Sequence, residues 1–176
     1  MKRVLCTAAV LVFATAAFAG TGELTPQQAM EKTMNCPVCS AFNEPATVGP
    51  SIRYSIQATK TGYVETFMTA DEKIMPDFEK CHAECERRAM GIPSMTKEQK
   101  DMLCPFCVGH VTMMDRKDLS FDSIKTPMGW VTVASSSTPE GVKALETYAA
   151  TAKKHSDLLA AAGKEMSSKE VMKSKM

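Results

Sequence analysis

Two pairs of short segments rich in β-branched and aromatic residues stand out from the polar background of the chain. The first pair is residues 52–58 and 63–69, and the second is residues 119–124 and 130–134. A short turn that contains a glycine joins the two members of each pair, as in a β-hairpin. The pattern therefore predicts four strands, arranged as two hairpins.

Apolar residues recur with helical spacing after each hairpin, and the two sets match when the chain is shifted by 67 residues. Met75, Phe78, Cys81 and Cys85 fall on Val142, Leu145, Tyr148 and Ala152. A helix start signal precedes each set, and two more, at Thr25 and Thr96, lie upstream of the hairpins. Each half of the chain is thus predicted to run helix, strand, strand, helix.

The same motif, CPxC, occurs in each half. It reads Cys36-Pro37-Val38-Cys39 in the first half and Cys104-Pro105-Phe106-Cys107 in the second. We interpret the chain as a tandem duplication of helix-hairpin-helix units, with unit 1 at residues 20–94 and unit 2 at residues 95–162. A lone hairpin is only marginally stable, so we expect an α+β fold in which both hairpins form one four-stranded antiparallel sheet with helices on one face. Residues 163–176 are polar and are expected to form a flexible tail.

The N-terminus has the pattern of a secretory signal peptide, residues 1–19. Two basic residues precede an apolar run over residues 4–18, which ends in an A-x-A site. The mature protein is therefore expected to be periplasmic or secreted. The run is too short for a membrane span and no second one follows, so no membrane partner is expected. A formal net charge of +1 gives no electrostatic case for binding nucleic acid.

Six cysteines remain after cleavage, in three pairs. The proline of each CPxC motif favours a helix start after the first cysteine, an environment that lowers a thiol pKa. The third pair, Cys81 and Cys85, is spaced to share one face of a helix. Its counterparts in unit 2 are core-facing positions, so this pair is expected to point inward, toward the helix that carries Cys36 and Cys39.

Three interpretations of the thiols compete. Structural disulfides would cross-link the helices of unit 1 and join Cys104 to Cys107. Metal binding would use two sites: Cys36, Cys39, Cys81 and Cys85 in unit 1, and Cys104, Cys107 and His110 in unit 2. Thiol–disulfide exchange would use the CPxC pairs. Of the other histidines, His82 is expected to point away from the thiol face and His155 to lie on the solvated side of the last helix.

The methionines favour the metal over the disulfides. The chain has 14 of them, and Met34 and Met102 each stand two residues before a CPxC motif. Met166, Met172 and Met176 lie in the polar tail, where filling a core is no explanation. Thiolates and thioethers are soft ligands, so copper is the first expectation for the metal and zinc the second.

Residues Met34–Cys39 and Met102–Cys107 resemble the M-x-C-x-x-C loop of heavy-metal-associated domains, a family of soft-metal chaperones with a ferredoxin-like fold. The resemblance implies a soft metal on Cys36 and Cys39 or on Cys104 and Cys107. A metal donor or acceptor protein is the expected partner of such a protein. The proline after each first cysteine departs from that family. The CPxC motif also resembles that of thioredoxin-superfamily oxidoreductases, and residues 129–142 look broadly like small uncharacterised exported bacterial proteins.

The sequence as a whole favours an exported protein that binds copper or zinc through Cys, His and Met ligands, without catalysis. A periplasmic CPxC thiol–disulfide oxidoreductase is the rival enzyme, and a disulfide-stapled structural or interaction module is the third candidate. The metal interpretation depends on sulfur atoms from separate helices of unit 1, Cys36 and Cys39 on one and Cys81 and Cys85 on the other, sharing a common centre.

Overall fold

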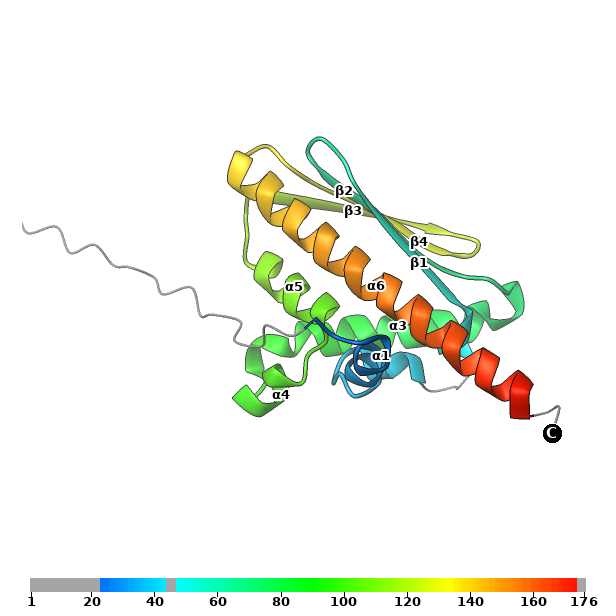
Figure 1. The fold of residues 1–176 in the computed structure, drawn as a ribbon. Helices are drawn as coiled ribbons and strands as arrows, with labels where there is room; N and C mark the ends of the chain where they lie inside the picture. Colours follow the sequence, from blue (N-terminus) through cyan, green and yellow to red (C-terminus); the bar gives the residue numbers. More distant parts are fainter. Residues whose placement is uncertain (1–22, 44–46, 174–176) are drawn as a thin grey trace, which may run out of the picture.

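The computed structural model describes residues 23–43 and 47–173 (Figure 1). Along the chain the elements are α1 (Pro26–Met34), α2 (Val48–Ser51), β1 (Ile52–Ala58), β2 (Gly62–Thr69), α3 (Met75–Met90), α4 (Lys97–Asp101), α5 (Pro105–Met114), β3 (Leu119–Thr126), β4 (Gly129–Ser136) and α6 (Pro139–Lys173). Short 3-10 helices occupy Cys39–Asn43, Glu72–Ile74 and Ile92–Ser94. The expected signal peptide and Met176 lie outside the described residues, as do the side chains of Met166 and Met172.

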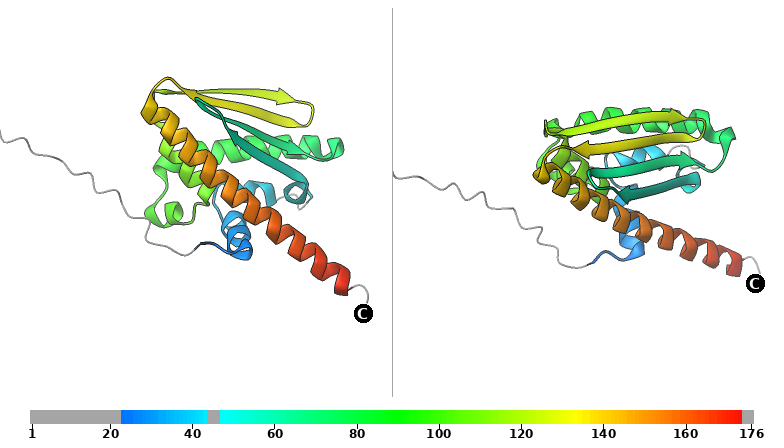
Figure 2. Two further views of the ribbon diagram at one scale, coloured as in Figure 1. Left: turned by 45° about the horizontal axis from the view of Figure 1, so that its top comes forward. Right: turned by 90° about the horizontal axis from the view of Figure 1, so that it is seen from above.

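The four strands form one antiparallel sheet in the order β1-β2-β4-β3. Within each hairpin the two strands pair with each other, and β2 also pairs with β4, from Gly62 opposite Ser135 to Met68 opposite Gly129. Figure 2 shows the two hairpins side by side in this sheet. The predicted hairpins and their joining in a four-stranded antiparallel sheet are confirmed.

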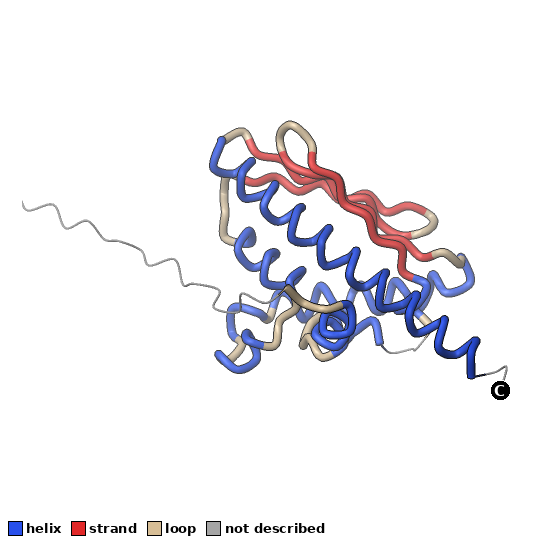
Figure 3. Tube along the Cα trace, in the orientation of Figure 1, coloured by secondary structure: helices blue, strands red, loops and turns tan. Residues whose placement is uncertain are grey.

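The helices lie on one face of the sheet, so the molecule has the α+β layering predicted from the sequence (Figures 1 and 3). Helix α6 crosses the sheet diagonally and packs against β1, β2 and β4. Tyr63, Leu145 and Tyr148 are buried between them, together with Ile56 and Met113. This layer is the main apolar core.

Two further groups of buried side chains lie among the helices. One is built around Phe42, Phe78 and Cys81, where α3 packs against the 3-10 helix Cys39–Asn43. The other surrounds the two CPxC motifs and includes Ile92 and Leu103. The motifs therefore lie in a second apolar group, which meets the core beneath the sheet at Phe106.

Glycines allow the two hairpins to approach each other. A Cβ atom on Gly62 would overlap the carbonyl oxygen of Ala134 in β4. Gly129 has a φ of +145°, which favours glycine, and a Cβ there would overlap the carbonyl oxygen of Phe67 in β2. The glycines that mark the hairpin turns in the sequence thus also mark the β2–β4 junction.

Threonines cap the helix that leads to each CPxC motif, as the start signals predict. Thr25 and Gln28 form a capping box at the start of α1, with a proline at the first helical position. Thr96 and Gln99 form the same box at the start of α4. Both reciprocal pairs satisfy backbone N–H groups that the helix itself leaves without partners.

The two halves share an order of elements, yet they differ in detail, and the tandem duplication and its unit boundaries remain predictions. The chain continues from the first motif as a 3-10 helix and from the second as the 10-residue α5. Helix α3 has 16 residues and α6 has 35. Because α6 runs to Lys173, the segment from Gly163 is helical up to that residue, where a flexible tail was expected. No helix of the described residues is long and apolar enough to cross a membrane.

Candidate metal centre

The structure brings the two CPxC motifs together at one point. The Sγ atoms of Cys36, Cys39, Cys104 and Cys107 all lie within 4.8 Å of one another. The first two belong to the segment after α1, and the last two belong to the start of α5. Cysteines 65 to 71 positions apart in the chain therefore share a common centre.

The sulfur separations suit a metal ion better than a covalent bond. Cys39 Sγ lies 3.4 Å from the Sγ atoms of both Cys104 and Cys107, and Cys36 Sγ lies 3.6 Å from that of Cys107. A disulfide would need about 2.05 Å. Four thiolates at about 2.3 Å from a tetrahedral zinc ion would lie about 3.8 Å apart, because that is the edge of such a tetrahedron. The cluster is close to the size that a tetrahedral ion requires.

The proline of each motif explains why its two cysteines point to the same side. Cys104 is extended, with φ −74° and ψ 164°, as expected for a residue that precedes proline. The chain then turns, and the N–H of Val108 donates to the carbonyl oxygen of Cys104 at 3.0 Å. The N–H of Ser40 donates to the carbonyl oxygen of Cys36 at the same distance. Both motifs thus make the same turn, which places the cysteines three residues apart on one side.

The centre is closed on most sides. Cys36 and Cys104 are fully buried, Cys107 is 7% exposed, and Cys39 is half-buried. Val38, Ile92 and Leu103 form part of its apolar wall. The four thiols hydrogen-bond one another in these surroundings, and a metal ion bonded to all four sulfurs would replace their mutual hydrogen bonds.

The thiols perturb one another strongly. Hydrogen bonds from Cys104, Cys107 and Cys39 hold the pKa of the Cys36 thiol far below its usual range. The same network raises the pKa of Cys39 and of Cys107, because each of these thiols donates its proton to a neighbouring sulfur and holds it more tightly. A cation at the centre would take the place of these protons and stabilise the remaining thiolates.

A cationic side chain anchors the first motif from outside. Arg88 of α3 donates from Nη1 to Ser40 Oγ at 2.9 Å and to the carbonyl oxygen of Pro37 at 3.4 Å. Its Nε atom donates to Glu84 at 2.7 Å, which fixes the guanidinium from the other side. The arginine therefore ties α3 to the first CPxC turn and adds positive charge near the thiol cluster.

The grouping of thiols expected within unit 1 is not the one the structure shows. Cys81 is buried in the group around Phe78, and burial raises its pKa. Cys85 is half-buried against the apolar wall of the centre but is not among the four converging thiols. Burial, followed by the nearby charges of Cys36 and Cys104, raises the pKa of Cys85 to about 12. The pair points inward as predicted, but α3 directs Cys81 into the aromatic group.

None of the three histidines is among the converging ligands of the thiol centre. His110 is exposed on α5 and is not among the converging ligands, which leaves the expected second site without its imidazole. His82 stacks on Trp130 with ring centroids 3.8 Å apart. The expected solvated position of His155 is wrong: this residue is 2% exposed, and its Nε2 lies 2.8 Å from Thr33 Oγ1. Helix α1 packs on α6 and covers it.

Sequence reasoning found all four thiols of the centre but assigned them to two sites. The signal that joins them is the identity of the motifs themselves, since the same turn in both halves can present two matching pairs to one ion. Comparison with protein-family models, with curated proteins and with solved structures gave no match, so the function must be argued from this centre.

Proposed function

We propose that this protein binds one thiophilic metal ion in a four-thiolate centre to which both CPxC motifs contribute. The observation that carries the proposal is the convergence of the four Sγ atoms within 4.8 Å. Thiolate ligands select soft or borderline ions. No catalytic role is included, because a site with four protein ligands leaves no open position for substrate.

Zinc fits this donor set best. A tetrahedral all-thiolate site is typical of zinc or of iron bound by cysteines, whereas Cu(I) is satisfied by fewer sulfur ligands. Copper, the first expectation from the sequence, becomes the rival occupant. Three of the four thiols are also nearly or fully buried, which is characteristic of a structural site and slows exchange of the ion.

The bound ion would join segments that are far apart in the chain. Because the ligands come together only in the folded protein, the free energy of metal binding adds to the free energy of folding. The ion would hold the turn after α1 against the start of α5. The protein is thus proposed to be stable when loaded and weakened when the ion is removed.

Export is part of the proposal and depends on the pattern of residues 1–19. An exported protein meets an oxidising environment, in which unprotected thiols form disulfides. A metal bound early would protect the four thiolates, and a donor protein would be needed to supply it. Such a donor or acceptor is the proposed partner.

The decisive experiment measures metal and thiols on the same sample. The mature protein is purified from the periplasm without chelator, its metals are quantified, and its thiols are counted by mass after alkylation. We expect one zinc ion per chain and four thiols that become alkylatable only after chelation. Metal-free protein in which the CPxC cysteines are joined as disulfides would overturn the proposal.

Matched variants separate the centre from the other thiols. Cys107→Ser removes a ligand, whereas Cys81→Ala removes a buried thiol outside the four. We expect the first to lose tetrahedral Co²⁺ absorption and the second to retain it. Turnover of insulin disulfides by the reduced protein, lost in Cys36→Ser, would instead support the oxidoreductase.

A further inference from the structure

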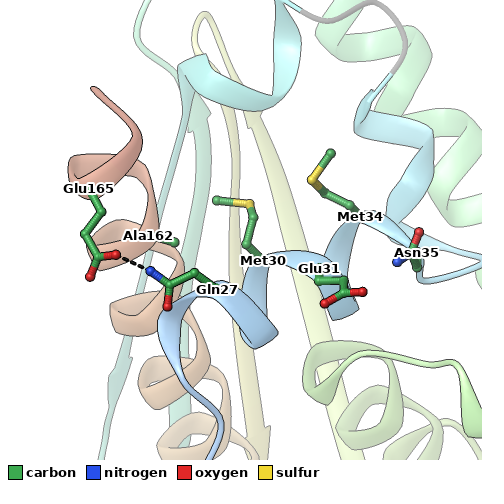
Figure 4. A pocket seen from close by; sticks show the side chains of 7 residues that line it. All are labelled: Gln27, Met30, Glu31, Met34, Asn35, Ala162 and Glu165. Carbon is green, nitrogen blue, oxygen red and sulfur yellow. Dashed lines mark hydrogen bonds between the residues drawn. The ribbon is translucent and has the colours of Figure 1, made fainter. Parts of the chain in front are cut away.

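A cavity of about 400 Å³ opens between α1 and α6 and is lined by methionine sulfur (Figure 4). Met30 and Met34 of α1 line it, together with Gln27, Glu31, Asn35, Ala162 and Glu165. We propose that this cavity is a second metal site, in which the Met30 and Met34 thioethers bind a soft monovalent cation, Cu(I) or Ag(I).

The two thioethers are placed to share an ion. Met30 and Met34 are four residues apart on α1, so their Cβ atoms are neighbours on one helix face, about 5–6 Å apart. Figure 4 shows both side chains on the same side of the helix, with Glu31 on the other. Three rotatable bonds in each side chain allow the two sulfurs to close on one ion without a change in the backbone.

Filling a core does not explain these side chains. Met34 is 50% exposed and Met30 is half-buried, with the open cavity beside them. The charge of the lining also suits a cation: it contains the carboxylate of Glu165 and, on the other side of α1 from the two thioethers, that of Glu31, but no lysine or arginine. Glu165 accepts a hydrogen bond from the Gln27 side chain, which holds that carboxylate at the rim.

Thioethers give the cavity a selectivity different from that of the thiol centre. They are neutral, soft ligands that suit Cu(I) and bind zinc poorly. The cavity would therefore discriminate against zinc, whereas the four thiolates accept either ion. This site uses none of the four cysteines and does not depend on whether they hold a metal.

The second half of the chain supplies a matched control. Met102 stands two residues before Cys104, as Met34 does before Cys36, and both are 50% exposed. The residue four positions before Met102 is Glu98, however, so Met102 has no thioether partner at the helical spacing. Exposure alone would make the two methionines equivalent, and only the pairing distinguishes them.

The test is methyl NMR of the full mature chain with ¹³C-labelled methionine methyl groups, using Ag(I) as a redox-stable probe and Cu(I) afterwards. Ag(I) is first added until the thiolate-to-metal absorption stops changing, so that the cysteines are saturated. Further Ag(I) is expected to shift the Met30 and Met34 methyl signals together, with one equivalent, at about tenfold lower free ion than Met102. Zinc is expected to leave both signals in place.

Leucine variants complete the test, because leucine has a similar volume and a strong helix propensity. Met34→Leu is expected to abolish the Ag(I)-induced shift of Met30, and Met102→Leu to leave it unchanged. Parallel titration of Met30, Met34 and Met102, or a Met30 shift that survives Met34→Leu, would overturn the proposal. So would a response of the cavity to apolar peptides but not to Ag(I). The methyl signals report this site even if the cysteines prove to be oxidised.

Discussion

The two CPxC motifs make the same turn but are built into the protein in different ways. The second opens α5, and its Phe106 packs against Tyr54 and His155, with ring centroids 5.0 and 4.8 Å away. The first continues into a short 3-10 helix and is held from outside by Arg88. Phe106 thus joins the second motif to the core beneath the sheet, whereas Arg88 of α3 holds the first. One sequence pattern can thus supply a pair in which both thiols are buried, Cys104 and Cys107, and a pair in which one thiol, Cys39, is partly exposed.

The largest effect expected from this difference concerns the ligands. Cys104→Ser should abolish stoichiometric metal binding and lower stability by several kcal/mol, because structural zinc contributes about 10–16 kcal/mol of binding free energy. Cys39→Ser should weaken binding less, since Cys39 is half-buried and the other three thiolates remain in place. Competition with a chelator and urea unfolding of both variants measure the contrast. Equal losses would show that the two halves of the centre are equivalent.

The apolar residue inside each motif should show the next largest contrast. Phe106→Ala is expected to lower the free energy of unfolding by about 2–4 kcal/mol, because the ring packs on both a strand and α6. Val38→Ala is expected to cost about 1–2 kcal/mol, although Val38 is more deeply buried, since fewer apolar atoms are lost. Denaturant unfolding of the metal-loaded proteins gives both values. A larger loss for Val38→Ala would reverse the roles assigned to the motifs.

The arginine that holds the first motif provides a smaller effect with an internal control. Arg88→Met should cost about 1–2 kcal/mol and speed metal release, because the hydrogen bonds to Ser40 and Pro37 are lost. Arg87 pairs with the same Glu84 but makes no such contact with the motif. Arg87→Met should therefore change stability by less than about 0.5 kcal/mol. Equal release rates in a chelator assay would contradict a role for Arg88 at the centre.

The smallest effect expected at mild pH concerns His155, beside the second motif. The pKa of His155 is lowered to about 4: burial is the main cause, the charge of Cys36 acts in the opposite direction, and the charge of Lys32 adds a smaller lowering. The unfolded chain therefore binds a proton at a higher pH than the folded protein, near the ordinary value of about 6.5. Stability is complete above that value and falls as the pH decreases from about 6.5 to 4.

The measurement is the pH dependence of urea unfolding of the reduced, metal-free protein, with His155→Gln as the comparison. At pH 5.5 the free energy of unfolding of the wild type should be lower than at neutral pH by on the order of 1 kcal/mol. The variant should show no such decrease. The physical reason is that a protonated imidazole would bury a charge, and its Nδ1 has no hydrogen-bond partner among the described residues. Identical pH profiles would show that another group controls the acid transition.

The sequence was most informative where structure is decided locally. The helix caps at Thr25 and Thr96, the strand segments and the glycine turns depend on neighbouring residues, and the structure confirms them. The joining of the two hairpins, seen as the pairing of β2 with β4, could also be predicted, because two marginal hairpins bury more apolar surface together than apart.

The side chains that contact each thiol could not be predicted from neighbouring residues in the same way. The spacing of Cys81 and Cys85 correctly predicts a shared helix face, but not which group of side chains that face meets. That depends on how α3 lies against Phe42 and Phe67, which are distant in the sequence. His155 was misplaced for a similar reason, since its cover is α1, at the opposite end of the described chain.

The pairing of Cys39 with Cys104 spans 65 positions of the chain. An ion shared by the two motifs would close this length into a ring, and in the unfolded state such a closure removes about 4 kcal/mol of conformational entropy. Unlike a disulfide, the closure can be undone by a chelator without breaking a covalent bond. After chelation, proteases would be expected to cut the opened chain much faster. The two hairpins would still keep their own hydrogen bonds.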